Sequence, residues 1–197
     1  MTSLPNDMIH EIMFHTTSLN DLQRLSQINQ YANALYHNYF SWVEKRRKEF
    51  LFNDVLPTDL NDIKILYQKL SDNYQLALRF KEKEVYIDMV TPLSKLKVIF
   101  NRGYRRLVKK LKHVKNYKLD VIMMIQTPQG YWISIQYKKP GHQHDIIDIH
   151  ITRHEYLCII AKAIYYLKDD DYIIYKGRSF NTVQEGNRIL DQLEESV

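Results

Sequence analysis

The spacing of apolar residues changes along this chain, and that change constrains the fold more than any other feature. In the first fifty residues, apolar side chains recur every three or four positions, as in Met8, Ile9, Ile12 and Met13. This is the period of a helix that buries one face. The run 85–89 instead alternates apolar and polar residues, as a half-buried strand does. The sequence therefore predicts an N-terminal helical region followed by a region that contains a sheet.

The helical region is expected to hold several short helices. One covers about 5–15 and starts at Pro5, because proline suits the first turn of a helix. Asn20 and Gln23 have the spacing of a capping box for the next helix, and a break near Asn29 separates that helix from the following one. Phe40, Trp42, Val43 and Phe50 indicate a further helix or an ordered tail. Asn53 to Pro57 then makes a natural boundary, which predicts a junction near residue 55 and domains 1–55 and 56–197.

The second domain is expected to be α+β. Its clearest element is a hairpin in which segments 119–126 and 131–138 flank Thr127, Pro128, Gln129 and Gly130, a sequence that suits a tight turn. Further strands are predicted at 85–89, 147–151 and 172–175. Helices are predicted at 59–70, 92–114 and 156–167, with a last helix capped by Thr182 and Glu185. This order favours a largely antiparallel sheet packed by helices.

Composition limits the class of protein. The chain of 197 residues has 45% apolar residues, which is enough for a packed core, and its formal charge of +5 is only mildly basic. The single cysteine, Cys158, excludes an intramolecular disulfide and favours an intracellular location, cytoplasmic or nuclear. No stretch approaches the 18 apolar residues of a membrane span. The abundance of Tyr, Ile, Lys, Asn and Asp is typical of an AT-rich genome, and a large DNA virus is one such source.

The first 45 residues resemble an F-box. The resemblance is carried by the segment from Ser3 to Ile12, by the segment from Asp21 to Ile28 with its Asp-Leu pair, and by Leu35 and Trp42. It implies a three-helix module that docks on a Skp-family adaptor and so joins a cullin-based ubiquitin ligase. The residues predicted to bind this partner are Leu4, Pro5, Ile9, Ile12, Leu22, Leu25 and Trp42.

Within that module the apolar residues are expected to divide into two groups. A module this small leaves some apolar side chains for a partner to cover. The exposed edge is predicted to be Leu4, Pro5 and Ile9. The residues predicted to hold the three helices together are Ile12, Leu22, Leu25, Ile28 and Leu35.

A basic segment offers a second candidate interface. Ten Lys or Arg residues and no acid lie between Asp88 and Asp120. On a helix they form a positive face for phosphates, an acidic partner or an anionic surface, or else a solvated face that acids elsewhere balance. The residues proposed for anion or nucleic-acid binding are Arg102, Arg105, Arg106, Lys109 and Lys110. A second basic run, 45–48, is either a nuclear-import signal or the polar side of a helix.

Other motifs give weaker signals. His142, His144, His150 and His154 are close in sequence, but a metal site also needs a third ligand such as Asp145 or Asp148, and no metal or cofactor is predicted. Cys158 is expected to be a packed thiol. Because no phosphate loop, nucleophile elbow or catalytic triad pattern is recognisable, the chain is not expected to be an enzyme.

These observations favour a non-enzymatic adaptor that binds a Skp-family protein through its helical module and a protein target through its α+β domain. Two alternatives stay open. One is a nucleic-acid-binding protein that uses the basic segment 95–118. The other is a structural or assembly protein of a virus, present in the virion, in which the helical module serves as a docking piece without a ligase.

Overall fold

The computed structural model describes residues 4–52, 57–80, 84–88, 99, 118–138, 144–168 and 171–195 of the chain. The chain divides into two compact units, 1–71 and 72–197, which we call the helical unit and the sheet unit. The division falls inside one helix, α5 (Leu60–Leu78). The junction predicted near residue 55 lies outside the described residues.

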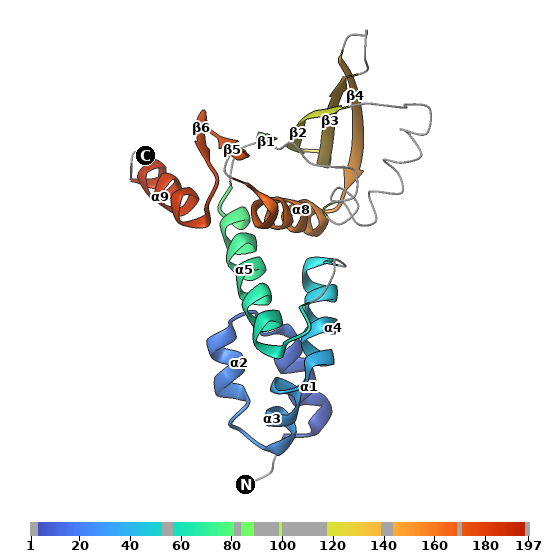
Figure 1. Ribbon diagram of the computed structural model, residues 1–197, viewed down its shortest axis with the longest axis vertical. Coiled ribbons are helices and arrows are strands. Elements are labelled where there is room, and N and C mark those ends of the chain that lie inside the picture. Colours follow the sequence, from blue (N-terminus) through green and yellow to red (C-terminus); the bar gives the residue numbers. More distant parts are fainter. Residues whose placement is uncertain are drawn as a thin grey trace. The chain divides into compact units, whose positions relative to one another are not determined.

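The helical unit contains four helices and the part of α5 up to Ser71 (Figure 1). The four helices are α1 (Asn6–His15), α2 (Leu19–Leu25), α3 (Gln30–Tyr36) and α4 (Tyr39–Phe50). The predicted helix 5–15, the break near Asn29 and the further helix around Trp42 are confirmed. The helix predicted at 59–70 is present but continues to Leu78.

Three of these helices start after a polar residue whose side chain caps the helix. Ser18 accepts a hydrogen bond from the backbone N–H of Asp21, Asn29 from that of Ala32, and Asn38 from those of Phe40 and Ser41. Each satisfies an N–H that has no partner within the helix. The capping box predicted at Asn20 and Gln23 is wrong, because α2 begins two residues earlier, after Ser18. Ser18 and Asp21 have the same three-residue spacing but lack the Glu or Gln that marks a capping box in sequence.

The sheet unit is α+β, as predicted. Its six strands form one antiparallel sheet in the order β4-β3-β2-β1-β5-β6. The strands are β1 (Glu84–Asp88), β2 (Lys118–Thr127), β3 (Gly130–Lys138), β4 (His144–Ile151), β5 (Tyr172–Tyr175) and β6 (Arg178–Phe180). The two helices after the strand β4 are α8 (Arg153–Tyr166) and α9 (Val183–Glu194).

The predicted hairpin is confirmed, with Thr127 paired to Gly130 across the turn. Gly130 has a φ of 136°, which residues with a Cβ rarely adopt, so the turn depends on glycine at this position. The strand predicted at 147–151 is also confirmed, since Ile147, Ile149 and Ile151 on β4 are all buried. Strand β6 was not predicted: its three residues are too short a run to show alternation.

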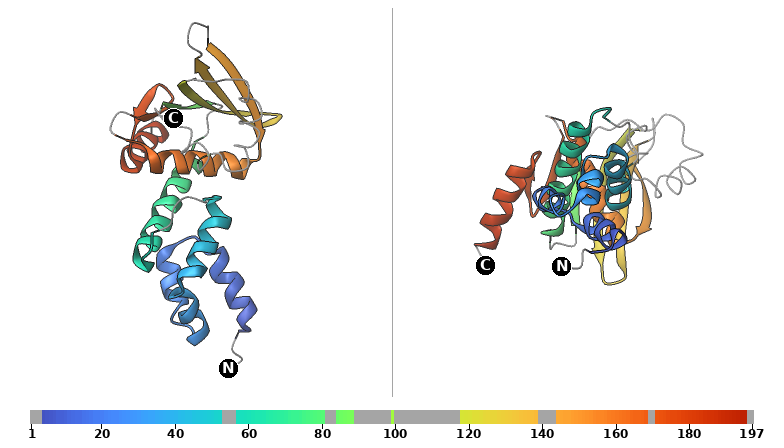
Figure 2. Two further views of the ribbon diagram at one scale, coloured as in Figure 1. Left: turned by 45° about the vertical axis from the view of Figure 1, so that its right-hand side comes forward. Right: turned by 90° about the horizontal axis from the view of Figure 1, so that it is seen from below.

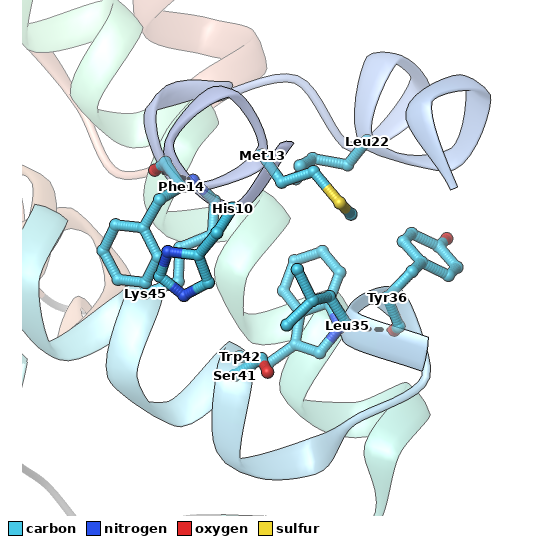
Figure 3. Close-up of a pocket in the computed structure, with 9 residues that line it drawn as sticks. All are labelled: His10, Met13, Phe14, Leu22, Leu35, Tyr36, Ser41, Trp42 and Lys45. Carbon is cyan, nitrogen blue, oxygen red and sulfur yellow. Dashed lines mark hydrogen bonds between the residues drawn. The ribbon is translucent and has the colours of Figure 1, made fainter. Parts of the chain in front are cut away.

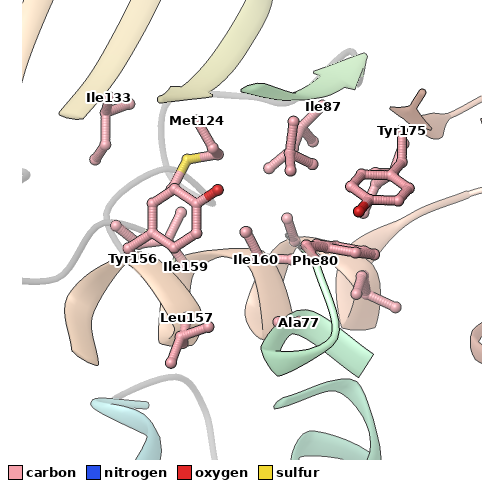
Figure 4. Close-up of a cluster of buried hydrophobic side chains, with 14 of the residues drawn as sticks. Ala77, Phe80, Ile87, Met124, Ile133, Tyr156, Leu157, Ile159, Ile160 and Tyr175 are labelled. Atoms are coloured by element: carbon pink, nitrogen blue, oxygen red, sulfur yellow. The ribbon is translucent and has the colours of Figure 1, made fainter. Parts of the chain in front are cut away.

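Helix α8 lies across one face of the sheet (Figures 1 and 2). Tyr156, Ile159 and Ile160 point from α8 towards Ile87 and Met124 of the sheet (Figure 4). The helix is held at its start by a full capping box between Thr152 and Glu155. Nine consecutive residues, 156–164, are buried, which explains why α8 is apolar over most of its circumference. They include the predicted packed thiol, Cys158.

Helix α9 packs closely on Leu76 of α5 and Phe180 of β6 at a glycine, Gly186. Thr182 caps it by accepting a hydrogen bond from the N–H of Glu185, as predicted. Arg79 also binds α9, because its guanidinium donates hydrogen bonds to Asn187 at 2.9 Å, Asp191 at 2.7 Å and Glu194 at 3.2 Å. A Cβ added at Gly186 would lie 2.8 Å from Leu76 Cδ2 and 2.9 Å from Phe180 Cε2. The absence of a side chain at this residue therefore sets how closely α9 approaches.

The predicted helix at 92–114 lies outside the described residues except for Ile99, which is helical and buried. Over the described parts of the chain, no helix combines the length and the apolar character that a membrane span requires.

We expect Gly186→Ala to lower the free energy of unfolding by about 1–3 kcal/mol, because the added methyl group overpacks the contact with Leu76 and Phe180. This sign is the reverse of the effect of Gly→Ala in an exposed helix interior, which gains about 1 kcal/mol. Urea unfolding followed by far-UV circular dichroism measures the change. Gln184→Ala, at an exposed position of the same helix, is the control, and a stabilised Gly186→Ala variant would contradict the close packing.

Lys162 makes the stability of the sheet unit depend on pH. It is only 1% exposed, and burial lowers its pKa from 10.5 to about 8. Between pH 8 and 10.5 the unfolded chain therefore binds a proton that the folded chain has released, so the free energy of unfolding rises with pH across this window. The rise contributed by Lys162 is expected to reach at most about 3 kcal/mol.

Lys162→Met should abolish this contribution, while Lys69→Met, at an exposed position, should not. Urea unfolding of the three proteins at intervals of half a pH unit tests this, because tyrosine ionisation affects all three alike. Parallel curves for the wild type and Lys162→Met would show that Lys162 does not release its proton in the window.

Candidate docking site

Helix α1 carries apolar residues on two different faces. Ile9 and Met13 are four residues apart and both are buried, so they form the face that packs into the helical unit. Met8 and Ile12 are also four residues apart and are 51% and 41% exposed, and Leu4, which precedes the helix, is 43% exposed. We call these three residues the docking stripe. An exposed apolar row beside a satisfied buried face is typical of a surface that a partner covers.

Polar groups border the docking stripe. On α1, Glu11 lies three residues from Met8, and its carboxylate is 3.2 Å from Nε2 of His15. Both side chains are largely exposed. An apolar centre with a solvated polar edge is the arrangement found at protein–protein interfaces.

The observed burial corrects part of the predicted division of the module. Leu4 and Pro5 are exposed and Leu22 is buried, as predicted. Ile9 was predicted to be exposed but is 3% exposed, and Ile12, predicted to lie in the core, is 41% exposed. At about 100° per residue, Ile12 lies about 60° from Ile9 and about 100° from Met13 around the helix, so it stands at the border of the buried face and packing leaves it partly exposed.

Two further positions in the module differ from expectation. Ile28, predicted to lie in the core, is 55% exposed because it sits in the turn after α2, where its N–H bonds to the carbonyl of Leu25. Leu25 and Leu35 are half-buried.

Trp42, predicted to bind the partner, lies in the core of the helical unit. It is 3% exposed, and its indole N–H donates to the carbonyl of Tyr36 at 2.8 Å. Its ring also meets those of Tyr36 and Tyr67 edge-on, at centroid distances of 5.6 and 5.3 Å. Trp42 therefore holds α3, α4 and α5 together.

A small pocket opens beside Trp42, between α1, α3 and α4. Figure 3 shows its lining, in which Met13, Leu22, Leu35 and Trp42 face a common space with His10 and Ser41 at its edge. The space available is about 30 Å³, which suits one water molecule or a methyl group. The pocket is therefore too small to take a large side chain of a partner.

A buried ion-pair network joins the end of α1 to α4 and α5. The ammonium group of Lys45 donates to the carbonyl of Phe14 and, at 2.6 Å, to Glu49 Oε1. The hydroxyl of Tyr67 donates to Glu49 Oε2 at 2.5 Å. Burial lowers the pKa of Lys45, and Glu49 opposes this shift. Burial and the nearby Glu49 carboxylate both raise the pKa of Tyr67 well above its ordinary value.

The burial of its residues tests the two interpretations of the basic run 45–48. Lys45 and Arg46 are 5% and 2% exposed, whereas Arg47 and Lys48 are exposed. Arg46 lies over the ring of Phe52 at 4.8 Å. The run is therefore not the solvated side of a helix, and its four charges are not available together to an import receptor.

The other predicted site residues are not brought together in the described part of the chain. Arg102, Arg105, Arg106, Lys109 and Lys110 lie outside the described residues, so the basic face stays a prediction. His142 lies outside them too, and His150 stacks edge-on against Trp132 at 4.9 Å. Within the described residues, no group of three or more His, Cys, Asp or Glu side chains is placed to hold a metal ion.

Comparison of the chain with protein-family models, curated proteins and solved structures finds no match. The F-box resemblance stays a prediction from the residues that carry it.

We expect Tyr67→Phe to lower the free energy of unfolding of the helical unit by about 1.5–3 kcal/mol, the usual contribution of a hydrogen bond to a charged group. Fluorescence of Trp42 during urea unfolding, in a Trp132→Phe background, reports on this unit because the chain has only two tryptophans. Tyr31→Phe is the control, since the Tyr31 hydroxyl makes no hydrogen bond to the described residues. Equal stabilities of the two variants would show that the hydrogen bond from Tyr67 to Glu49 does not stabilise the helical unit.

Proposed function

We propose that the helical unit is an F-box-like module that docks on a Skp-family adaptor through the docking stripe, and that the protein is a non-enzymatic adaptor of a cullin-based ubiquitin ligase. The observation that supports this most is the exposure of Met8 and Ile12 on one face of α1 and of Leu4 just before the helix. They lie in the segment from Ser3 to Ile12 that carries the resemblance.

The energetics of the docking stripe are sufficient for recruitment. Burying one aliphatic side chain of this size stabilises a complex by roughly 1.5–3 kcal/mol when it is fully covered. Part of each side chain is already covered, since Leu4, Met8 and Ile12 are about half exposed. Three such anchors, with the neighbouring ring of Pro5, can still decide whether the adaptor is bound, because a few central residues carry most of the energy of an interface.

The proposal divides the predicted partner-binding residues by role. Leu4, Pro5 and Ile12 contact the adaptor, and Met8 joins them. Ile9, Leu22 and Trp42 are buried and act by holding the helices of the unit together. In the same proposal the sheet unit presents a protein target.

We expect the double variant Met8→Asp, Ile12→Asp to weaken binding of a purified Skp-family adaptor at least about 100-fold, because each new carboxylate must be desolvated at the apolar interface. Titration of the labelled full chain with the adaptor, followed by fluorescence anisotropy, measures this. We expect submicromolar binding for the parent chain.

Ile65→Asp is the matched control, because Ile65 is 53% exposed, on α5, and lies off the stripe. Circular dichroism of all variants verifies the fold. If the parent chain does not bind, the ligase proposal is wrong; if Ile65→Asp weakens binding as much as the double variant, the docking face has been assigned to the wrong helix.

A further inference from the structure

The sheet unit contains an open cavity of about 310 Å³ between the end of α5, the start of β3 and the first turns of α8. Its apolar walls are formed by Ala77, Phe80 and Leu157. Its polar lining comes from Tyr131, Arg153 and Tyr156. This volume is at the lower end of the range for sites that bind small molecules, and the mixture of apolar walls with a few polar groups is typical of them.

Two of the polar groups at the cavity lack partners among the described residues. Arg153 is exposed and forms no ion pair or hydrogen bond with these residues. The hydroxyl of Tyr156 is buried and has no hydrogen-bond partner in the same part of the chain. Burial raises the pKa of Tyr156, so this hydroxyl keeps its proton and stays a donor. Unsatisfied buried hydroxyl groups are uncommon in folded proteins and call for an explanation such as a ligand.

Tyr131 adds a third donor. It is half-buried, its ring lies 5.0 Å from that of Tyr156, and its hydroxyl makes no hydrogen bond to the described residues. Among the described residues, the cavity lining therefore contains a cation and two hydroxyl groups but no carboxylate.

The start of α8 reinforces this preference for negative charge. Arg153 is the first residue of the helix, where the backbone carries partial positive charge. The nearby carboxylate of Glu155 is engaged in the capping box, with Oε2 accepting hydrogen bonds from the N–H and the hydroxyl of Thr152 at 2.9 and 3.1 Å.

We propose that this cavity binds a small organic acid. The carboxylate of the ligand pairs with the guanidinium of Arg153 and accepts hydrogen bonds from the hydroxyls of Tyr131 and Tyr156, while its apolar body packs against Ala77, Phe80 and Leu157. This proposal is independent of docking by the helical unit, because every residue it uses belongs to the sheet unit.

Hexanoate is a suitable probe, and hexanamide is its neutral counterpart of the same shape. Titration of the full chain, followed by protein-observed NMR, should give saturable binding of hexanoate with a Kd of about 1 mM or lower. Hexanamide should bind at least about tenfold more weakly, because an uncharged amide gains no ion pair with Arg153.

Arg153→Gln should weaken hexanoate binding about tenfold or more and leave hexanamide binding unchanged. Arg188→Gln, an exposed arginine on α9 that does not line the cavity, should leave both unchanged. Tyr131→Phe should weaken hexanoate binding by a smaller factor. The proposal is overturned if hexanoate does not saturate the wild type, if hexanamide binds equally well, or if Arg153→Gln behaves like Arg188→Gln.

Discussion

One buried ammonium group holds the helical unit together. Lys45 bonds to the last turn of α1 through the carbonyl of Phe14 and to Glu49 on its own helix, and its charge lies 5.3 Å from the centre of the Tyr67 ring on α5. A buried charge is tolerated only when such partners are in place, so the ends of these helices must come together for the unit to fold. In this arrangement Ile9 and Met13 of α1 are buried and the docking stripe is exposed.

Much of the fold could be predicted because its signals are local. The alternation at 85–88 and 147–151, the Thr127 to Gly130 turn and the Thr182 cap each depend on residues close in sequence, and all are present in the structure. The start of α2 could not be predicted in the same way, because Ser18 and Asn20 are both suitable caps and packing selects between them. Strand β6 pairs over only three residues, and its place comes from β5 beside it.

The candidate sites depend on information that the sequence does not carry locally. Ile9 and Ile12 are chemically equal, and only the packing of α1 separates the buried one from the exposed one. Lys45 and Arg46 belong to one charged run, but the burial of Lys45 follows from partners as distant as Phe14 and Tyr67, and Arg46 packs on Phe52. The cavity in the sheet unit is lined by Ala77, Tyr131 and Arg153, which lie more than twenty residues apart in sequence. No local sequence motif could therefore predict it.

The position of β1 between β2 and β5 has a consequence for synthesis of the chain on the ribosome. Its partners on one side are residues 122–125, but those on the other side are residues 172–174, which are made much later. Until they emerge, β1 presents an unpaired edge next to strands that have already been made. Pairing at such long sequence separation is slow, because a long loop must close first. During synthesis the incomplete sheet can therefore pair wrongly with other chains. This period ends only when β5 has been made and has paired with β1.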